Sequence, residues 1–197
     1  MDLVRVGRAA FGWQYRGWAA LAATTATLYF VAVLFPAAAK RSGSPENRIV
    51  DLQRAYTRKA FISVLECWSA SKPDAVGLLK RHNLVALDLV FPALYAMSFG
   101  FGYAWLRARR EPTPADTVLF LAPLVAASFD YVENGIHLSL LSEIDTIADV
   151  RRTAASGGFG PVPIAAASAA AHAKYLLLTV SAVGILIAAF HRLRALR

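Results

Sequence analysis

Four long apolar runs, separated by shorter charged segments, constrain this sequence more than any other feature. They cover residues 17–39, 83–106, 117–141 and 164–190. A helix needs about 20 mainly apolar residues to cross the hydrocarbon core of a bilayer, so each run is long enough for one transmembrane helix. One bundle of this kind accounts for the whole chain. The sequence therefore predicts an all-α fold, an integral membrane four-helix bundle, with a single membrane domain over residues 1–197.

Composition supports this interpretation. Apolar residues make up 57% of the 197 residues and charged residues 17%, whereas ordinary soluble domains carry about 25% charged residues. The first run follows Arg5, Arg8 and Arg16, as the core of a secretory signal would, but it is longer than the 7–15 residues of such a core. We expect this helix to be retained. A cleaved signal followed by three spans is the alternative.

The net charge of +8 would suggest nucleic acid as a partner of a soluble protein. Here the charges lie between apolar runs, where anionic headgroups and topology explain them better. No zinc-finger spacing, RNA-binding signature or basic region with heptads occurs, so nucleic-acid binding is not expected. Membrane lipids are the expected partners. The small-residue run 165–173 permits close helix packing, either within the chain or in a homo-oligomer.

The connection between the first two runs is polar and predicts an amphipathic extramembrane helical segment over residues 45–82. From Ile49 to Trp68 its apolar residues fall near helical spacing. These are Ile49, Leu52, Tyr56, Val64, Leu65 and Trp68. Such a helix is too polar to span and would lie at the interface or fold over the bundle mouth, with a solvated connector as the alternative. Residues 73–80 predict a second short helical turn, and the single cysteine, Cys67, is expected to be a small core residue.

The distribution of Lys and Arg predicts the orientation. The N-terminus, the second connection and the C-terminus carry three each within very short segments, and the third connection carries two against three acidic residues. The positive-inside rule then places both termini in the cytoplasm, in a multi-pass protein of the plasma or inner membrane. Four residues argue the other way: Lys40, Arg41, Lys80 and Arg81.

Polar residues inside the predicted spans are the strongest indication of a site. Four of them form one stripe on the third helix at positions i, i+3, i+4 and i+7: Asp130, Glu133, Asn134 and His137. On the second helix Asp88 and Tyr95 share a similar stripe, and the fourth helix contributes His172 and Lys174. At 1.5 Å per residue, the ionisable groups of the three helices fall in the same half of the membrane.

The free-energy cost of burying ionisable groups in a membrane predicts that these side chains lie close together. An Asp, Lys or Arg at mid-helix costs about 2.5–3.5 kcal/mol on insertion, and four such groups together cost on the order of 10 kcal/mol when left apart. We therefore expect Asp88, Asp130, Glu133 and Lys174 to face the interior and pair with one another. Pro92 has no N–H group to offer the carbonyl of residue 88, so the second helix should bend there.

The same residues carry a resemblance. The motifs Asp-x-x-Phe-Pro-x-x-Tyr at residues 88–95 and Asp-x-x-Glu-Asn at residues 130–134, with a lysine in the last helix, resemble those of a family of small four-helix membrane proteins. The similarity covers about residues 60–178. It implies the fold and the polar site but brings no activity, cofactor or partner with it. In that family a threonine often precedes the lysine by about three residues, and here Ala171 replaces it, so a role for that hydroxyl does not carry over.

Charge balance leads to a functional hypothesis. Three carboxylates face one lysine, so a carboxyl group must keep its proton, a histidine must take one up, or a cation must bind. A carboxylic acid that is protonated near neutral pH is a natural general acid or base. We therefore expect a site that binds or acts on a small lipidic or amphipathic molecule. Glu133, Asp130 and Lys174 are the candidate catalytic residues. The candidate ligand-binding residues are Asp88, Tyr95, Asn134, His137 and His172.

Four other interpretations remain open. The charges could only fix helix packing, with Asn134 bonding a neighbour's backbone. The carboxylate stripe with His137 could serve a proton- or cation-coupled transporter subunit. Glu133 and His137 at i, i+4 could share a metal face, although no His-x-x-His box occurs and no metal is predicted. A scaffold role through the amphipathic helix is the fourth. No nucleotide loop, Ser/His/Asp pattern or haem signature is present, so no cofactor is predicted and enzymatic activity stays open.

Overall fold

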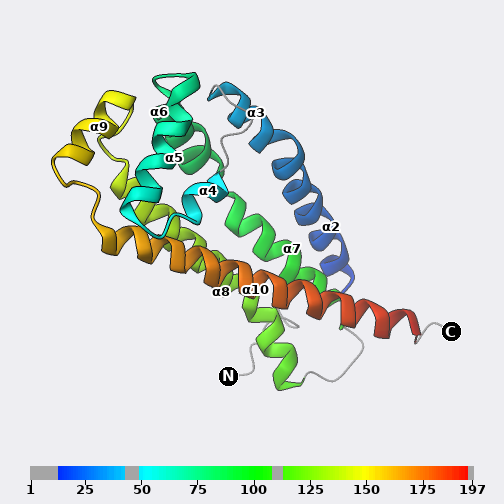
Figure 1. Cartoon of the computed structure of the whole chain (residues 1–197). Helices are drawn as coiled ribbons and strands as arrows, with labels where there is room; N and C mark the ends of the chain where they lie inside the picture. The colour runs from blue at the N-terminus through cyan, green and yellow to red at the C-terminus, as the bar shows by residue number, and fades with distance from the viewer. Residues whose placement is uncertain (1–12, 43–48, 108–112, 195–197) are drawn as a thin grey trace. The chain divides into compact units, whose positions relative to one another are not determined.

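The computed structural model describes residues 13–42, 49–107 and 113–194, and all regular elements in these ranges are helical (Figure 1). Four of the helical stretches are long and apolar enough to cross a membrane: Gly17–Arg41, Ala75–Leu106, Pro114–Leu140 and Pro161–Arg194. The all-α class and the four apolar helices predicted from the sequence are thus confirmed. The predicted start of the amphipathic segment at residues 45–48 and most of the charged turn at residues 108–112 lie outside the described residues.

The first two long stretches each contain a π-helical segment. The first consists of α2 (Trp13–Tyr29), η1 (Phe30–Leu34) and α3 (Phe35–Arg41). The second consists of α6 (Ala75–Leu79), η2 (Lys80–Leu87) and α7 (Phe91–Leu106). The third and fourth are the continuous helices α8 (Pro114–Leu140) and α10 (Pro161–Arg194). Three shorter helices lie in the connections: α4 (Ile49–Gln53), α5 (Arg58–Ser71) and α9 (Ile147–Ala155).

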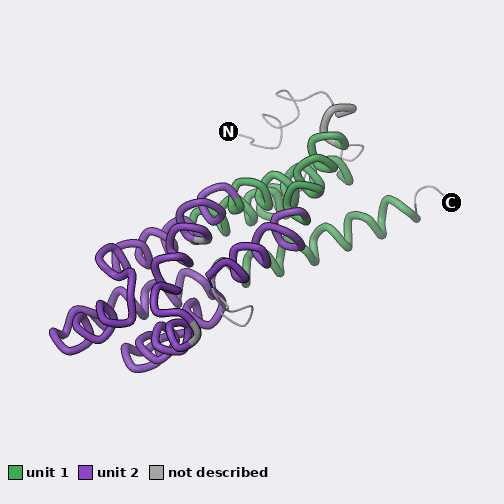
Figure 2. The backbone as a smooth tube through the Cα atoms, turned by 90° about the horizontal axis from the view of Figure 1, so that it is seen from above, with its two compact units in different colours: residues 1–28, 91–128, 174–197 green, residues 29–90, 129–173 purple. Residues whose placement is uncertain are grey.

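The chain forms two compact units, shown in different colours in Figure 2. Unit 1 comprises residues 1–28, 91–128 and 174–197, and unit 2 comprises residues 29–90 and 129–173. In unit 1, Thr24 and Ser98 join α2 to α7 through their hydroxyl groups, 2.7 Å apart. The carboxylate of Asp116 at the start of α8 accepts hydrogen bonds from Tyr103 and Arg107. The ends of α7 and α8 are therefore tied by a buried acid with two donors.

The predicted bend in the second span is a break. Helix η2 ends at Leu87, a turn follows over residues 88–90, and α7 begins at Phe91. Pro92 stands where a helix would need an N–H group for the carbonyl of Asp88. The sequence therefore explains why the helix is interrupted at the acidic residue.

The amphipathic connection differs from its prediction because it forms two helices rather than one between Ile49 and Trp68. Thr57 has extended backbone angles and its side chain accepts a hydrogen bond from the N–H of Ala60 at 3.2 Å, so it is the N-cap of α5. Tyr56 lies in the turn before this cap and is half exposed. The second short helical turn predicted at residues 73–80 is present as α6. Cys67, expected in the core, is exposed on α5.

Unit 2 has a core built from two connections far apart in the sequence. Phe61 and Leu65 of α5, Val150 of α9, and Ile144 after α8 are all buried in one apolar cluster. The ring of Phe61 lies 5.5 Å from that of Phe159. Long-range burial thus joins the first connection to the third.

Helix α9 was not predicted from the sequence, although its signal is present. Thr146 and Asp149 form a capping box, in which the Thr146 side chain accepts from the N–H of Asp149 and the Asp149 carboxylate accepts from the N–H of Thr146. The spacing Thr-x-x-Asp is a known start signal for helices. The hydrogen bonds from the Thr146 hydroxyl and backbone hold the pKa of Asp149 below its usual value. The carboxylate therefore stays ionised at the helix N-terminus, where negative charge is favourable.

Candidate functional site

The polar stripe predicted on the third span lies in the part of α8 that belongs to unit 2, and its side chains are buried. Glu133 and His137 have no solvent-exposed surface, and Asn134 and Asp130 are 2% and 6% exposed. Asp88, just after η2 in the same unit, is also buried. Burying this many ionisable groups in a segment long enough to span a membrane costs free energy. Such groups therefore point to a functional role.

Glu133 and His137 form the centre of the stripe. One turn of α8 separates them, and Glu133 Oε1 lies 3.7 Å from His137 Nδ1, an ion pair whenever the imidazole is protonated. The ring of Phe61 from α5 stacks on that of His137, with centroids 6.3 Å apart and ring planes 21° from parallel. An acid–base pair is therefore held under an aromatic cover that comes from the amphipathic connection.

Two side chains of α8 bind backbone carbonyls at the helix break. Asn134 Nδ2 donates to the carbonyl of Asp88 at 3.3 Å, and the Tyr131 hydroxyl donates to the carbonyl of Leu89 at 3.1 Å. The carbonyl of Asp88 is the one that Pro92 leaves without a helical donor. Asn134 thus bonds the backbone of a neighbouring segment, as expected if the polar residues fix helix packing. Tyr131 was not singled out from the sequence, because a tyrosine in an apolar run gives no sign of its partner.

The remaining predicted residues are placed differently. His172 of α10 is exposed, its Nδ1 lies 2.8 Å from the carbonyl of Ser168, and its ring lies 5.1 Å from that of Tyr56. It is therefore not part of the buried stripe. Lys174 and Tyr95 are both buried but belong to unit 1, whereas the carboxylates belong to unit 2. The pairing of Lys174 with a carboxylate stays a prediction.

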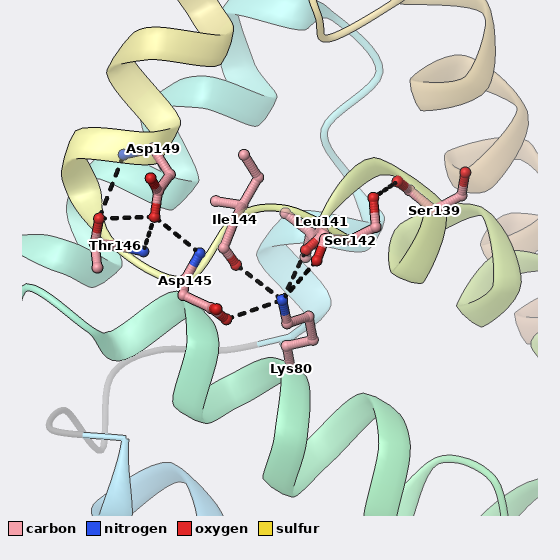
Figure 3. Close-up of polar contacts among 8 residues, drawn as sticks. All are labelled: Lys80, Ser139, Leu141, Ser142, Ile144, Asp145, Thr146 and Asp149. Carbon is pink, nitrogen blue, oxygen red and sulfur yellow. Dashed lines mark hydrogen bonds and ion pairs between the residues drawn. The ribbon is translucent and has the colours of Figure 1, made fainter.

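Lys80, at the start of η2, is a structural residue that the sequence analysis treated only as a loop charge. Figure 3 shows its ammonium at the end of α8, where it donates to the carbonyls of Leu141, Ser142 and Ile144 at 2.9–3.2 Å. The Asp145 carboxylate lies 2.9 Å from the same nitrogen. These carbonyls follow the last turn of α8, where helical donors run out and cations are favoured. Lys80 therefore fixes the end of the helix that carries the polar stripe.

A pocket of about 700 Å³ lies elsewhere on α8 in unit 2. Its wall includes Val132, Ile136 and Ser139 of α8 and Thr153 of α9, and none of the four stripe residues lines it. The stripe therefore does not open onto this pocket.

The described residues contain no group of three or more His, Cys, Asp or Glu side chains placed to hold a metal ion. Comparison with known proteins adds no second source of information: no protein-family model, no curated protein and no solved structure matches this chain.

Proposed function

We propose that this protein is a multi-pass membrane protein that binds a small lipidic or amphipathic molecule at the buried polar stripe of α8. One observation carries the proposal: Glu133 and His137 are wholly buried side by side within a span-length apolar helix. Polar contacts between membrane helices stabilise packing by only about 0.6–2 kcal/mol each, less than the free-energy cost of inserting a charged group. A role in binding therefore explains the buried Glu133 and His137 better than helix packing does.

The membrane arrangement is part of this proposal. The four long helices form one transmembrane bundle, and α4, α5 and α9 lie outside the hydrocarbon core. Many large apolar side chains on the four long helices are exposed, among them Leu21, Val118 and Leu186 at 56–69%. Lipid tails would cover such side chains. Lys80, one of the four residues that argued against cytoplasmic termini, is neutralised by Asp145 and by helix-end carbonyls. A neutralised Lys80 contributes little to the count of positive charges that decides orientation.

Orientation can be tested on the native side chain of Cys67, because it is the single cysteine of the chain and is exposed on α5. With both termini in the cytoplasm, α5 faces the outside. A membrane-impermeant maleimide added to intact cells should therefore label the protein, and a Cys67→Ser variant should give the background signal. Labelling that appears only after the membrane is permeabilised would reverse the proposed orientation.

The roles follow from charge and position. Glu133 and Asp130 receive the polar head and exchange protons with it, while His137 is the proton partner one turn from Glu133. Asp88 adds a third carboxyl group, Asn134 and Tyr131 hold the helix break in place, and Lys174 of α10 is the proposed charge partner. With three carboxyl groups for one lysine, the head that fits best carries an ammonium or hydroxyl donor rather than a carboxylate.

A pair of probes of opposite charge tests this site. The purified protein should bind a long-chain amino alcohol about tenfold more tightly than a fatty acid of equal length, since one charge-assisted hydrogen bond is worth about 1.5–3 kcal/mol. A Glu133→Gln variant should lose this preference. Glu143→Gln, which removes an exposed carboxylate just beyond the same helix, should keep it. Equal affinities of wild type and Glu133→Gln for both probes would leave the stripe as packing only.

A proton- or cation-coupled transporter subunit is the second candidate, and the helix break at Asp88 favours it. Interrupted membrane helices expose backbone carbonyls, which together with carboxylates are common ligands of transported cations. In this chain Asn134 and Tyr131 already donate to the two carbonyls at the break. Protein reconstituted into sealed vesicles should show proton or sodium flux that Asp88→Asn abolishes; vesicles without flux remove this candidate.

A further inference from the structure

Unit 1 contains a second groove, on different residues from the acidic stripe. It has a volume of about 670 Å³ and is formed by the start of α2, the end of α7 and the end of α10. Its apolar wall includes Leu21, Leu106 and the indole of Trp105, and among the described residues that line it Arg192 is the ionisable one. The described lining of the groove thus combines an apolar wall with the cation of Arg192.

Arg192 is held in a fixed position at this groove. Its Nη1 donates to the carbonyl of Trp105 at 2.7 Å, and its guanidinium carbon lies 4.0 Å from the centroid of the Trp105 ring. A guanidinium has five N–H donors in a rigid fork, so this single hydrogen bond leaves several for another acceptor. Stacking on an indole and bidentate binding of a phosphate are both characteristic of arginine rather than lysine.

The backbone of α2 is fitted to the same tryptophan. A Cβ atom at Gly17 would lie 2.9 Å from Nε1 of Trp105, so a larger residue there would displace the indole on which Arg192 stacks. Beside it, Trp18 is 72% exposed and belongs to the groove wall. Tryptophan side chains favour the headgroup level of a membrane, with their rings against the acyl chains. In the proposed membrane arrangement, these tryptophans put the groove at the level where a headgroup meets its acyl chains.

The last described turn of α10 carries two arginines, Arg192 and Arg194. Asp116, a buried acid of unit 1, is already engaged by Tyr103 and Arg107 and does not line the groove. Arg194 stands two residues beyond Arg192, with its guanidinium 4.6 Å from the ring of Phe190. A basic site with an apolar wall complements a molecule with an anionic head and an acyl chain. Anionic lipids concentrate in the cytoplasmic leaflet, where the proposed orientation puts this end.

We propose that this groove binds an anionic phospholipid, with a phosphate oxygen on the guanidinium of Arg192 and an acyl chain along Leu21 and Trp105. The site is independent of the amphiphile site at Glu133. Lipid surrounds every membrane protein, so what distinguishes this groove is a preference among lipid headgroups. The groove selects an anionic head over a zwitterionic one, and Arg192 carries that selection.

Native mass spectrometry of the delipidated full chain tests the preference with two probes of identical acyl chains, phosphatidylglycerol and phosphatidylcholine. Both probes offer a phosphate to Arg192, and they differ in the group beyond it, a neutral glycerol in one and a choline cation in the other. Wild-type protein should take up the first phosphatidylglycerol at about tenfold lower concentration, because the choline cation and the Arg192 guanidinium repel each other at close range in a low-dielectric site. Arg192→Gln should lose most of this ratio. Arg194→Gln removes the same charge two residues away and should keep the ratio within about twofold, because exposed charges contribute little.

A second variant leaves the charge intact. At Gly102 an added Cβ would meet only Ile185, at 3.9 Å, so Gly102→Leu is tolerated by the backbone and fills the groove. It should weaken binding of phosphatidylglycerol even though Arg192 remains. Equal losses in Arg192→Gln and Arg194→Gln would show a general effect of basic charge and overturn the proposal. So would an unchanged preference in Arg192→Gln, or unchanged binding of phosphatidylglycerol in Gly102→Leu.

Discussion

Replacing Phe61 by alanine is expected to lower the free energy of unfolding by about 3–5 kcal/mol, the usual cost of removing a buried phenyl ring. The side chain is wholly buried and contacts the rings of both His137 and Phe159. It therefore joins α5 to the polar stripe of α8 and to the segment before α10. Thermal and denaturant unfolding in detergent, followed by circular dichroism, measures the loss.

The matched control for this substitution is Phe190→Ala, because Phe190 is 53% exposed on α10 and loses little packing. If Phe61→Ala unfolds like Phe190→Ala, the cover over His137 is not part of the folded core. The proposed function adds a second expectation. Removing the ring should expose the stripe and speed the binding of an amphipathic probe, even as stability falls.

Lys80→Met should cost about 2–4 kcal/mol. The substitution removes an ammonium that donates to three backbone carbonyls at the end of α8 and pairs with Asp145. Hydrogen bonds to a charged group contribute about 1.5–3 kcal/mol each, and we discount their sum because Asp145 is more than half exposed. Unfolding of the variant measures the cost, and faster amide hydrogen exchange at residues 141–150 would place it at the end of α8.

Lys72→Met is the control for Lys80→Met, since it removes the same charge just before α6. Its ammonium lies 3.9 Å from Asp74, and both side chains are exposed by more than 40%. We expect little change in the free energy of unfolding. Lys80→Arg should recover part of the loss, because it keeps the charge but cannot place its donors at the same point. Equal stability of the Lys80→Met and Lys72→Met variants would show that the helix end needs no cation.

Local sequence signals predicted the long helices well. Apolar runs of 23–27 residues seldom form anything but long buried or membrane-spanning helices. The missing N–H of Pro92 predicted a bend at Asp88, and the helix is interrupted there. The stripe of Asp130, Glu133 and His137 was also predictable, because helical spacing alone puts these residues on one face. Burial confirms that this face is turned away from solvent.

The contacts between the two connections could not be predicted in the same way. Lys80 binds carbonyls 61–64 residues away, and nothing local distinguishes it from Lys72. Phe61 contacts His137 and Phe159 because α5 packs near the end of α8. Long-range burial determines this packing, and the local spacing of apolar residues does not reveal it. The break at Thr57 was missed because the apolar spacing continues across it. The start of α9 at Thr146 was missed although its capping box is visible in the sequence.

Glu133 is proposed to belong to a binding site and not merely to a helix contact. A native mass spectrum of the wild-type protein extracted in mild detergent, beside the Glu133→Gln and Glu143→Gln variants, tests this role. We expect a retained amphipathic molecule on the wild type and on Glu143→Gln, and we expect Glu133→Gln to lose most of it. Identical spectra for all three folded proteins would contradict this role.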